Sequence, residues 1–175
     1  MSNQVVIRAL RAEDWDDVDR LYPRAFPAED LLPLLERLRS ESTGVLFFVA
    51  EIDDEVIGHI CFTMCSMEKG GSDLALLGPL AVDPAAQHAG IGSSLVRYGL
   101  ARLAERQVER VFVLGDPAYY GRFGFQRDTD AAAPYTLPPD WASAWQSLAL
   151  RSDAPRHAGR LSVPVPWRDE TLWAP

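Results

Sequence analysis

Apolar residues in the first part of the chain alternate between the spacing of strands and the spacing of helices. Residues 5–10 are β-rich and predict a first strand. Glu13 and Asp14 then place acidic residues in the first turn of a helix, where the helix dipole favours them. The apolar face of this helix is formed by Trp15, Val18, Leu21, Tyr22 and Ala25. We expect Pro23 and Pro27 to interrupt it.

A second helix and a hairpin are expected next. The helix covers about residues 29–39, and its apolar side is formed by Leu31, Leu34, Leu35 and Leu38. Two β-rich runs follow, over residues 46–52 and 56–64, with Asp53-Asp54 between them. A short acidic turn between two such runs is typical of an antiparallel hairpin.

The longest buried run covers residues 74–82 and leads into the most informative stretch of the chain. It breaks at Asp83-Pro84, passes Gly90 and Gly92, and enters an amphipathic helix that ends near Arg106. The apolar residues of that helix are Ile91, Leu95, Leu100, Leu103 and Ala104.

The order of the elements predicts a mixed α/β fold. A buried strand at residues 110–114 follows the glycine-led helix, and a strand, a helix and a strand in this order imply a parallel, right-handed crossover. Antiparallel strands precede this crossover, so the sheet is not an all-parallel, doubly wound one. The tail over residues 128–175 is rich in proline and tryptophan, with strand-like runs at residues 145–150 and 161–165. We expect one domain over residues 1–175.

The two glycines lie where a helix N-terminus follows the end of a strand. The first N–H groups of a helix have no partner inside it and the dipole adds partial positive charge, so such a place binds phosphate. The dinucleotide site of an oxidoreductase needs a third glycine, where this chain has Leu95. A Walker A loop is excluded because no Gly-Lys-Ser/Thr follows. Two glycines alone also fit an alternative interpretation, in which they begin a helix and bind no ligand.

Composition narrows the functional class. The formal net charge of -8 disfavours a nucleic-acid binder, which would need a basic surface. No stretch approaches the roughly 20 apolar residues that span a bilayer, and residues 1–4 lack the features of a signal peptide, so we expect a cytoplasmic protein without a membrane partner. Cys61 and Cys65 are expected to stay reduced, because same-face strand residues four apart are too distant for a disulfide. The three histidines are scattered, and we expect no metal site.

Two motifs in order carry a family resemblance. Gln87-x-x-Gly90-x-Gly92, following residues 80–84, resembles the Q/R-x-x-G-x-G/A pyrophosphate motif of the GNAT superfamily of acetyl-CoA-dependent N-acetyltransferases. Residues 120–125 match the family's Y-x-x-x-G-F signature, and the wider run 114–125 resembles a branch of predicted bacterial acetyltransferases with L-G-x-P-x-Y-Y-x-R-F-G-F. The chain departs from the family pattern at His88-Ala89, where many relatives have Arg or Lys, and at residues 115–118, where many have Asn-x-x-Ala.

The resemblance covers about residues 5–127 and implies a particular fold. We expect a GNAT-like mixed, mostly antiparallel sheet with a central, splayed, parallel strand pair, flanked by helices. The C-terminal part, about residues 128–175, is divergent and carries no further motif of the family.

The resemblance also implies that acetyl-CoA is the co-substrate. The loop residues expected to hold its pyrophosphate are Gln87, His88, Ala89, Gly90, Ile91, Gly92 and Ser93. The pantetheine arm is expected along Leu80, Ala81 and Val82, with the Val82 N–H polarising the thioester carbonyl as an oxyanion hole does. Pro79 fits a splayed strand, since proline cannot donate to a sheet ladder. Tyr120 matches the family's catalytic tyrosine and is expected to protonate the leaving thiolate.

The general base and the acceptor are less constrained. Glu29 is the candidate base, and Asp30, His59, Asp116 and an ordered water stay as alternatives. The acceptor pocket is expected between three segments: residues 26–32, residues 59–65, and the tail around Trp141, Trp145 and Trp167.

We therefore expect an N-acetyltransferase that transfers the acetyl group directly to a primary amine. The acceptor is a small molecule or a peptide, and a homodimer is left open. The alternative function is a non-catalytic acyl-CoA-binding sensor on the same scaffold.

Overall fold

The computed structural model describes residues 4–41, 43–71 and 73–174. The strands are β1 (Val6–Ala9), β2 (Val45–Ile52), β3 (Glu55–Met67), β4 (Leu74–Val82), β5 (Arg110–Leu114), β6 (Gln126–Arg127), β7 (Ala131–Ala132), β8 (Trp145–Ala149) and β9 (Gly159–Ser162). The α-helices are α1 (Trp15–Ala25), α2 (Leu32–Arg39), α3 (Ile91–Glu105) and α4 (Pro117–Tyr120). Residues 1–3, on which part of the signal-peptide argument rests, lie outside the described residues.

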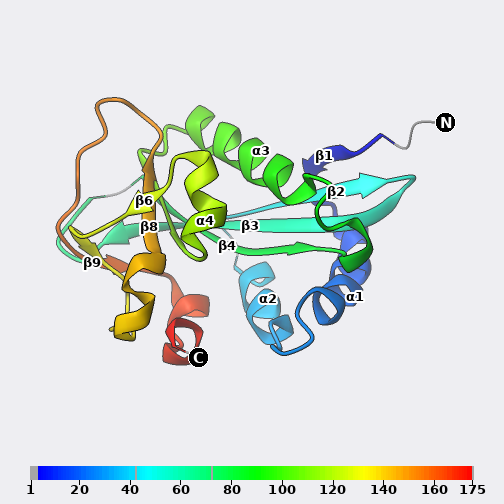
Figure 1. Cartoon of the computed structure of the whole chain (residues 1–175), viewed down its shortest axis with the longest axis horizontal. Coiled ribbons are helices and arrows are strands. Elements are labelled where there is room, and N and C mark those ends of the chain that lie inside the picture. Colours follow the sequence, from blue (N-terminus) through cyan, green and yellow to red (C-terminus); the bar gives the residue numbers. More distant parts are fainter. Residues whose placement is uncertain (1–3, 42, 72, 175) are drawn as a thin grey trace. The chain divides into compact units, whose positions relative to one another are not determined.

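Within the described part of the chain, the strands pair in the order β1-β2-β3-β4-β5-β8-β6 (Figure 1). β1 runs antiparallel to β2, and β8 runs antiparallel to both β5 and β6. β4 and β5 form a parallel pair. Asp53 and Asp54 both have positive φ, 51° and 64°, as a two-residue hairpin turn of type I′ requires. The predicted mixed sheet with its hairpin and its central parallel pair is confirmed.

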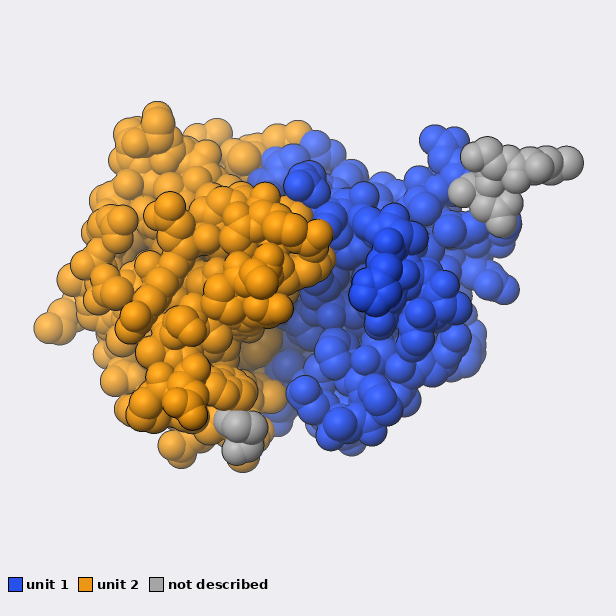
Figure 2. Space-filling model, in the orientation of Figure 1, with its two compact units in different colours: residues 1–62, 78–102 blue, residues 63–77, 103–175 orange. Residues whose placement is uncertain are grey.

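Contacts within the chain define two compact units, shown in different colours in Figure 2. The first comprises residues 1–62 and 78–102, and the second comprises residues 63–77 and 103–175. β3, β4 and α3 each contribute residues to both units. The single domain expected over residues 1–175 stays a prediction.

In the first unit, helices cover both faces of the strands (Figure 1). Consecutive residues of a strand point to opposite faces. A Cβ built on Gly58 of β3 would meet Leu95 of α3 at 2.9 Å, whereas the next residue, His59, contacts Tyr22 of α1. α1 and α3 therefore pack on opposite faces of β3.

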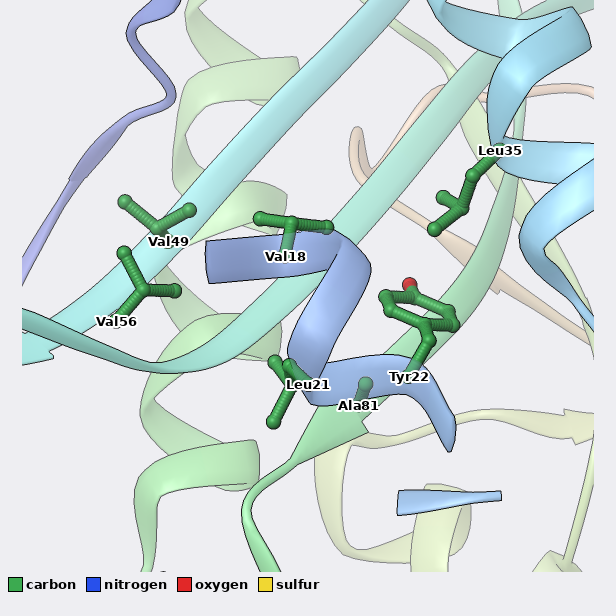
Figure 3. Packing of buried hydrophobic residues seen from close by; sticks show 7 residues of the cluster. All are labelled: Val18, Leu21, Tyr22, Leu35, Val49, Val56 and Ala81. Atoms are coloured by element: carbon green, nitrogen blue, oxygen red, sulfur yellow. The ribbon is translucent and has the colours of Figure 1, made fainter. Parts of the chain in front are cut away.

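The core on the α1 face joins helices and strands that are distant in the sequence (Figure 3). Its buried residues are Val18, Leu21, Tyr22, Leu35, Val49, Val56 and Ala81. They come from α1, α2, β2, β3 and β4. Ala81, near the end of β4, is 1% exposed. The cluster therefore holds the end of β4 against α1.

The two N-terminal helices differ from the prediction at their ends. Pro23 lies inside α1 and does not interrupt it, because only the last turn follows and a single carbonyl loses its partner. α2 begins at Leu32 rather than near Glu29. Pro33 explains this start, since proline is tolerated only in the first turn, where its N–H would be unpaired anyway.

α3 agrees with the predicted helix, with one error on its apolar face. Ile91, Leu95 and Leu103 are buried, but Ala104 is exposed. Gly99 is buried instead, because its missing side chain leaves room for the ring of Phe62. A Cβ on Gly99 would lie only 2.0 Å from Cε2 of that ring.

The second unit is built around tryptophans of the tail. Trp145 stacks on Phe112 at a centroid distance of 5.4 Å and meets the edge of Trp173 at 6.0 Å. The indole N–H of Trp167 donates to Thr63 Oγ1 at 3.0 Å. Trp145 and Trp167 are 3% and 8% exposed, so both belong to the core of this unit. The expectation that the tail around them shapes the acceptor pocket stays a prediction. The last strand is also earlier than predicted, at residues 159–162.

Cys61 and Cys65 are not joined by a disulfide bond. Cys61 is buried, and burial raises the pKa of the Cys65 thiol well above its usual value. Within the described ranges, no group of three or more His, Cys, Asp or Glu side chains is placed to hold a metal ion. None of the helices that the structure describes is long and apolar enough to cross a membrane.

Candidate active site

The parallel pair separates where the sequence places a proline. β4 pairs with β5 through Leu74, Ala75 and Leu76 only, and this register ends before Gly78-Pro79. Gly78 has a φ of 138°, a backbone conformation that favours glycine, and Pro79 has no N–H to donate. The last part of β4, Leu80 to Val82, therefore belongs to the first unit and leads directly into the glycine loop.

Hydrogen bonds fix the entry to this loop. The Asp83 N–H donates to the Ile57 carbonyl at 2.8 Å, and Asp83 Oδ1 accepts from the Ala85 N–H at 2.9 Å. Gln87 turns back on the strand, where its Nε2 donates to the Val82 carbonyl at 3.1 Å. Arg24, in the last turn of α1, forms an ion pair with Asp83 at 2.7 Å. The loop thus leaves β4 from a fixed position.

The loop before α3 and the N-terminus of that helix form an open cradle. His88 and Gly90 have positive φ, 66° and 80°, and the chain from residue 87 to residue 90 is exposed. Ser94 closes the turn, because both its N–H and its hydroxyl donate to the Gly90 carbonyl at 3.0 Å. The N–H groups of the first helical turn have no acceptor inside the helix. This arrangement presents backbone donors and the positive end of the dipole to an anion.

Gly58 sets the position of this cradle, and the sequence analysis missed it. A Cβ at residue 58 would lie 2.9 Å from Leu95 and 3.3 Å from Ile91, the first residue of α3. A glycine inside an otherwise apolar strand is the signal that could have revealed this close approach. Ile91 itself is 4% exposed and anchors the helix start, while a Cβ on Gly90 would have no neighbour within 4 Å. The ligand side of the turn is therefore open.

Tyr120 belongs to the second unit and is held by the short helix α4. Asp116 caps this helix, since its Oδ1 accepts from the Ala118 N–H at 2.9 Å. The Tyr120 ring packs edge-on against Tyr119 and Phe125, with centroid distances of 5.0 and 5.7 Å. Burial, with a smaller effect of Tyr119, raises the pKa of the Tyr120 phenol well above its usual value. The hydroxyl therefore stays protonated and is a donor.

Glu29 lies at a pocket of about 360 Å³ in the first unit. The lining residues are Tyr22, Pro23, Phe26, Pro27, Ala28, Glu29, Asp30, Leu31 and Leu32. One side of this corner is aromatic and aliphatic, and the exposed Glu29 and Asp30 add two carboxylates. Asp30 Oδ1 also accepts from the Leu32 N–H at 3.2 Å, which helps to set the start of α2. Such a pocket combines apolar contact with negative charge.

His59 is fully buried beside this pocket wall. Its Nδ1 lies 2.7 Å from the Tyr22 hydroxyl, and Trp15 and Phe47 flank the imidazole. Burial lowers the pKa of His59 to about 3, so the ring is neutral at physiological pH. Taking a proton from an ammonium group with a pKa of about 10 would then be uphill by about 7 units, or about 10 kcal/mol. This argues against His59 as the general base.

The predicted site residues thus fall into two groups. The first unit brings together Leu80, Ala81 and Val82 with the loop from Gln87 to Ser93, and Glu29 lies in the same unit. Tyr120 is in the second unit, on its own helix. Besides the close approach at Gly58, sequence reasoning missed the ion pair of Arg24 with Asp83, which no local pattern signals.

A parallel strand pair that separates at a proline, followed by a glycine-led helix start, is the arrangement of a GNAT acetyltransferase. The chain belongs to the Acetyltransferase (GNAT) family, which residues 10–125 match. It is similar to the uncharacterized N-acetyltransferase YjhQ of Escherichia coli strain K12, with 31% identity over 166 residues that cover 90% of each sequence.

Two solved structures extend the similarity to the fold. The GNAT family N-acetyltransferase YhbS from Escherichia coli, in complex with CoA, superposes with a TM-score of 0.88 at 29% identity and covers 97% of this chain and 94% of that one. A GNAT family acetyltransferase from Brucella melitensis, in complex with acetyl-CoA, gives a TM-score of 0.77 at 29% identity, with coverages of 94% and 99%.

Proposed function

We propose that this protein uses acetyl-CoA to acetylate a primary amine directly, without a covalent enzyme intermediate. The observation that carries this proposal is the exposed loop over residues 87–90, which follows a proline-interrupted strand and leads into the N-terminus of α3, where backbone N–H groups are available to an anion. The CoA and acetyl-CoA complexes of the two similar structures support the same ligand here.

The donor would bind along one continuous segment of the first unit. The N–H groups around residues 88–93 would hold the pyrophosphate, and the hydroxyl of Ser93, in the same segment, would donate a further hydrogen bond to it. Leu80, Ala81 and Val82 would offer backbone groups to the amides of the pantetheine arm, in the manner of an added strand. The exposed His88-Ala89 pair stands where many relatives carry Arg or Lys, so the His88 side chain would supply the side-chain contact to the pyrophosphate at this place.

The reaction joins the amine nitrogen to the acetyl carbon and breaks the carbon–sulfur bond. The attacking ammonium loses two protons in all, one before attack and one as the tetrahedral species collapses, and the leaving CoA thiolate takes up one. The Val82 N–H would stabilise the oxyanion that develops on the carbonyl oxygen. Tyr120, held protonated by burial, would donate to the sulfur as its charge develops.

The acceptor would occupy the pocket at the corner between α1 and α2. Phe26 and Leu32 would offer apolar contact, and Glu29 would offer a carboxylate that attracts an ammonium and accepts its proton. Glu29→Gln is expected to raise the KM for the amine and to leave the affinity for acetyl-CoA unchanged. An unchanged KM and kcat in this variant would remove Glu29 from the mechanism.

Thermal unfolding with and without acetyl-CoA tests donor binding. At 100 times Kd a ligand adds about 2.7 kcal/mol, which raises the Tm of a protein of this size by about 5–10 °C. We expect Ser93→Asp to abolish this shift, because the new carboxylate repels the pyrophosphate while it suits the helix dipole. Ala101→Asp is the matched control, with the same charge change on the same helix about 12 Å away. A Tm raised by NADH and not by acetyl-CoA would contradict the proposal.

Acetyl transfer to a panel of amines tests catalysis. Spermidine, an aminoglycoside and a peptide with a free N-terminus are incubated with acetyl-CoA, and both free thiol and the acetylated product are measured. Tyr120→Phe is expected to lower kcat by about 100-fold or more, because a general acid contributes about that much. Binding of acetyl-CoA without acetylation of any amine would instead favour the sensor.

Initial rates with both substrates varied test direct transfer. A ternary mechanism gives intersecting double-reciprocal lines, whereas an acetyl-enzyme intermediate gives parallel lines. We expect intersecting lines. Cytoplasmic location and a homodimer are separate predictions, which cell fractionation and light scattering test.

A further inference from the structure

Gly115, between β5 and α4, lies directly against the ring of Tyr120. A Cβ built on Gly115 would lie 2.4 Å from Cε2, 2.9 Å from Cδ2 and 3.5 Å from Cζ of that ring. Ordinary contacts of a Cβ begin near 3.4 Å, so the ring edge occupies the space that any side chain at residue 115 would need. The glycine is required here for close approach and not for an unusual backbone angle.

The Tyr120 ring is half-buried and packs against aromatic neighbours. Phe125, which is 3% exposed, meets it edge-on at 5.7 Å. Tyr119 packs edge-on at 5.0 Å, and Phe123 lies at 6.4 Å. Aromatic rings therefore contact the Tyr120 ring in addition to the backbone at Gly115, and they limit the directions in which it can move.

The backbone of Gly115 is fixed by two hydrogen bonds, one to backbone and one to a side chain. Its N–H donates to the Ala144 carbonyl at 3.0 Å, and its carbonyl accepts from Gln146 Nε2 at 3.0 Å. Gln146 is 1% exposed and also donates to the Ala144 carbonyl. Because the backbone cannot give way easily, a side chain at residue 115 has to displace the tyrosine.

We propose that Gly115 is the positioning residue for Tyr120: its bare Cα is the surface against which the ring is set, and so it fixes where the hydroxyl points. This inference rests on the proposed function, in which that hydroxyl donates to the leaving sulfur. Restoring an ordinary contact from 2.4 to 3.4 Å needs a displacement of about 1 Å. Errors of about 1 Å in a catalytic group cost about 100-fold in rate.

Gly115→Ala is the direct test, measured with acetyl-CoA and the fastest amine of the panel. We expect kcat to fall by about 100-fold, while the KM for acetyl-CoA and the Tm shift that it causes stay at wild-type values. Gly121→Ala is the matched control, since residue 121 directly follows Tyr120 and a Cβ there has no neighbour within 4 Å. This control should keep the wild-type kcat.

The same substitution in a Tyr120→Phe background separates positioning from general damage. The Phe ring meets the same Cβ, but no hydroxyl remains to misplace, so Gly115→Ala should cause no further loss of kcat. An equal further loss, or a wild-type kcat for Gly115→Ala alone, would overturn the inference. Should Gly115→Ala fold poorly, Phe125→Leu removes the opposing ring instead and should lower kcat with acetyl-CoA binding retained. A wild-type kcat in Phe125→Leu would count against the inference.

Failure of the proposed function has a different signature. In that case acetyl-CoA does not raise the Tm of the wild type, or Tyr120→Phe keeps the wild-type kcat. Failure of the positioning inference alone leaves Tyr120→Phe slow and Gly115→Ala fast.

Discussion

Gly99→Ala in the middle of α3 sets helix propensity against packing. Glycine inside a helix is about 1 kcal/mol less favourable than alanine, so propensity alone predicts that this variant is more stable. In the structure, the new Cβ would lie 2.0 Å from Cε2 and 2.4 Å from Cζ of Phe62. Phe62 is fully buried and packs against Phe48 at a centroid distance of 6.2 Å.

The packing effect is the larger of the two. Moving the Phe62 ring from 2.0 Å to an ordinary contact of 3.4 Å requires a shift of about 1.4 Å inside a filled core. Overpacking of this kind costs about 3 kcal/mol, the upper part of the usual range. The expected net result is a loss of about 2 kcal/mol in the free energy of unfolding, or about 4–8 °C in Tm.

Urea denaturation followed by tryptophan fluorescence measures this loss. The same substitution in a Phe62→Leu background should reverse sign and stabilise by up to about 1 kcal/mol, because the clash is gone and the propensity gain stays. If Gly99→Ala stabilises the wild type, or destabilises both backgrounds equally, the reasoning is refuted.

Three further substitutions test the electrostatics of the first unit. The pKa of His59 is about 3 in the folded protein and about 6.5 in the unfolded protein, so between these values the unfolded state binds one more proton and the free energy of unfolding falls as the pH falls. Urea titrations should therefore show a loss of about 2.5 kcal/mol between pH 7 and pH 4.5. The His59→Gln variant should not show this loss. Asp14→Asn should lower the free energy of unfolding by about 3 kcal/mol, measured by the same method. The reason is that the buried Asp14 carboxylate accepts hydrogen bonds from both terminal nitrogens of Arg8, at 2.7 and 2.9 Å. Arg24→Gln should change the free energy of unfolding by at most about 1 kcal/mol, because the Arg24 side chain of the ion pair with Asp83 is largely exposed. A loss as large as that of Asp14→Asn would contradict this.

The sequence predicted the main elements because their signals are local. The period of the apolar residues placed the strands and helices, and the Asp53-Asp54 turn placed the hairpin. The ends were less accurate: Pro33 marks the start of α2, but the periodicity of Leu31 and its neighbours extended the predicted helix too far. Ala104 was assigned to the buried face of α3 because its spacing fits the helical period, but it is exposed. Gly99 is buried instead, because it lies against the ring of Phe62.

The candidate site shows the same division. The glycine loop and Tyr120 were identified from short motifs whose geometry is set by their own backbone. Trp145 and Trp167 are core residues, which the sequence did not indicate, because tryptophans in a proline-rich tail give no sign of what they pack against. His59 was an alternative base until its burial and its contact with Tyr22 placed it in a neutral, apolar environment.

By itself, the sequence determined the family, the order of the elements, and the loop that would receive the donor, because each is encoded in residues that are neighbours along the chain. Only the tertiary structure decided which residues hold these parts in place. Gly58, Gly99 and Gly115 each make room for a side chain that the fold brings near. Arg24 reaches the end of β4 from a helix about 60 residues earlier. Contacts of this kind depend on strand register and helix packing, which a local pattern does not specify.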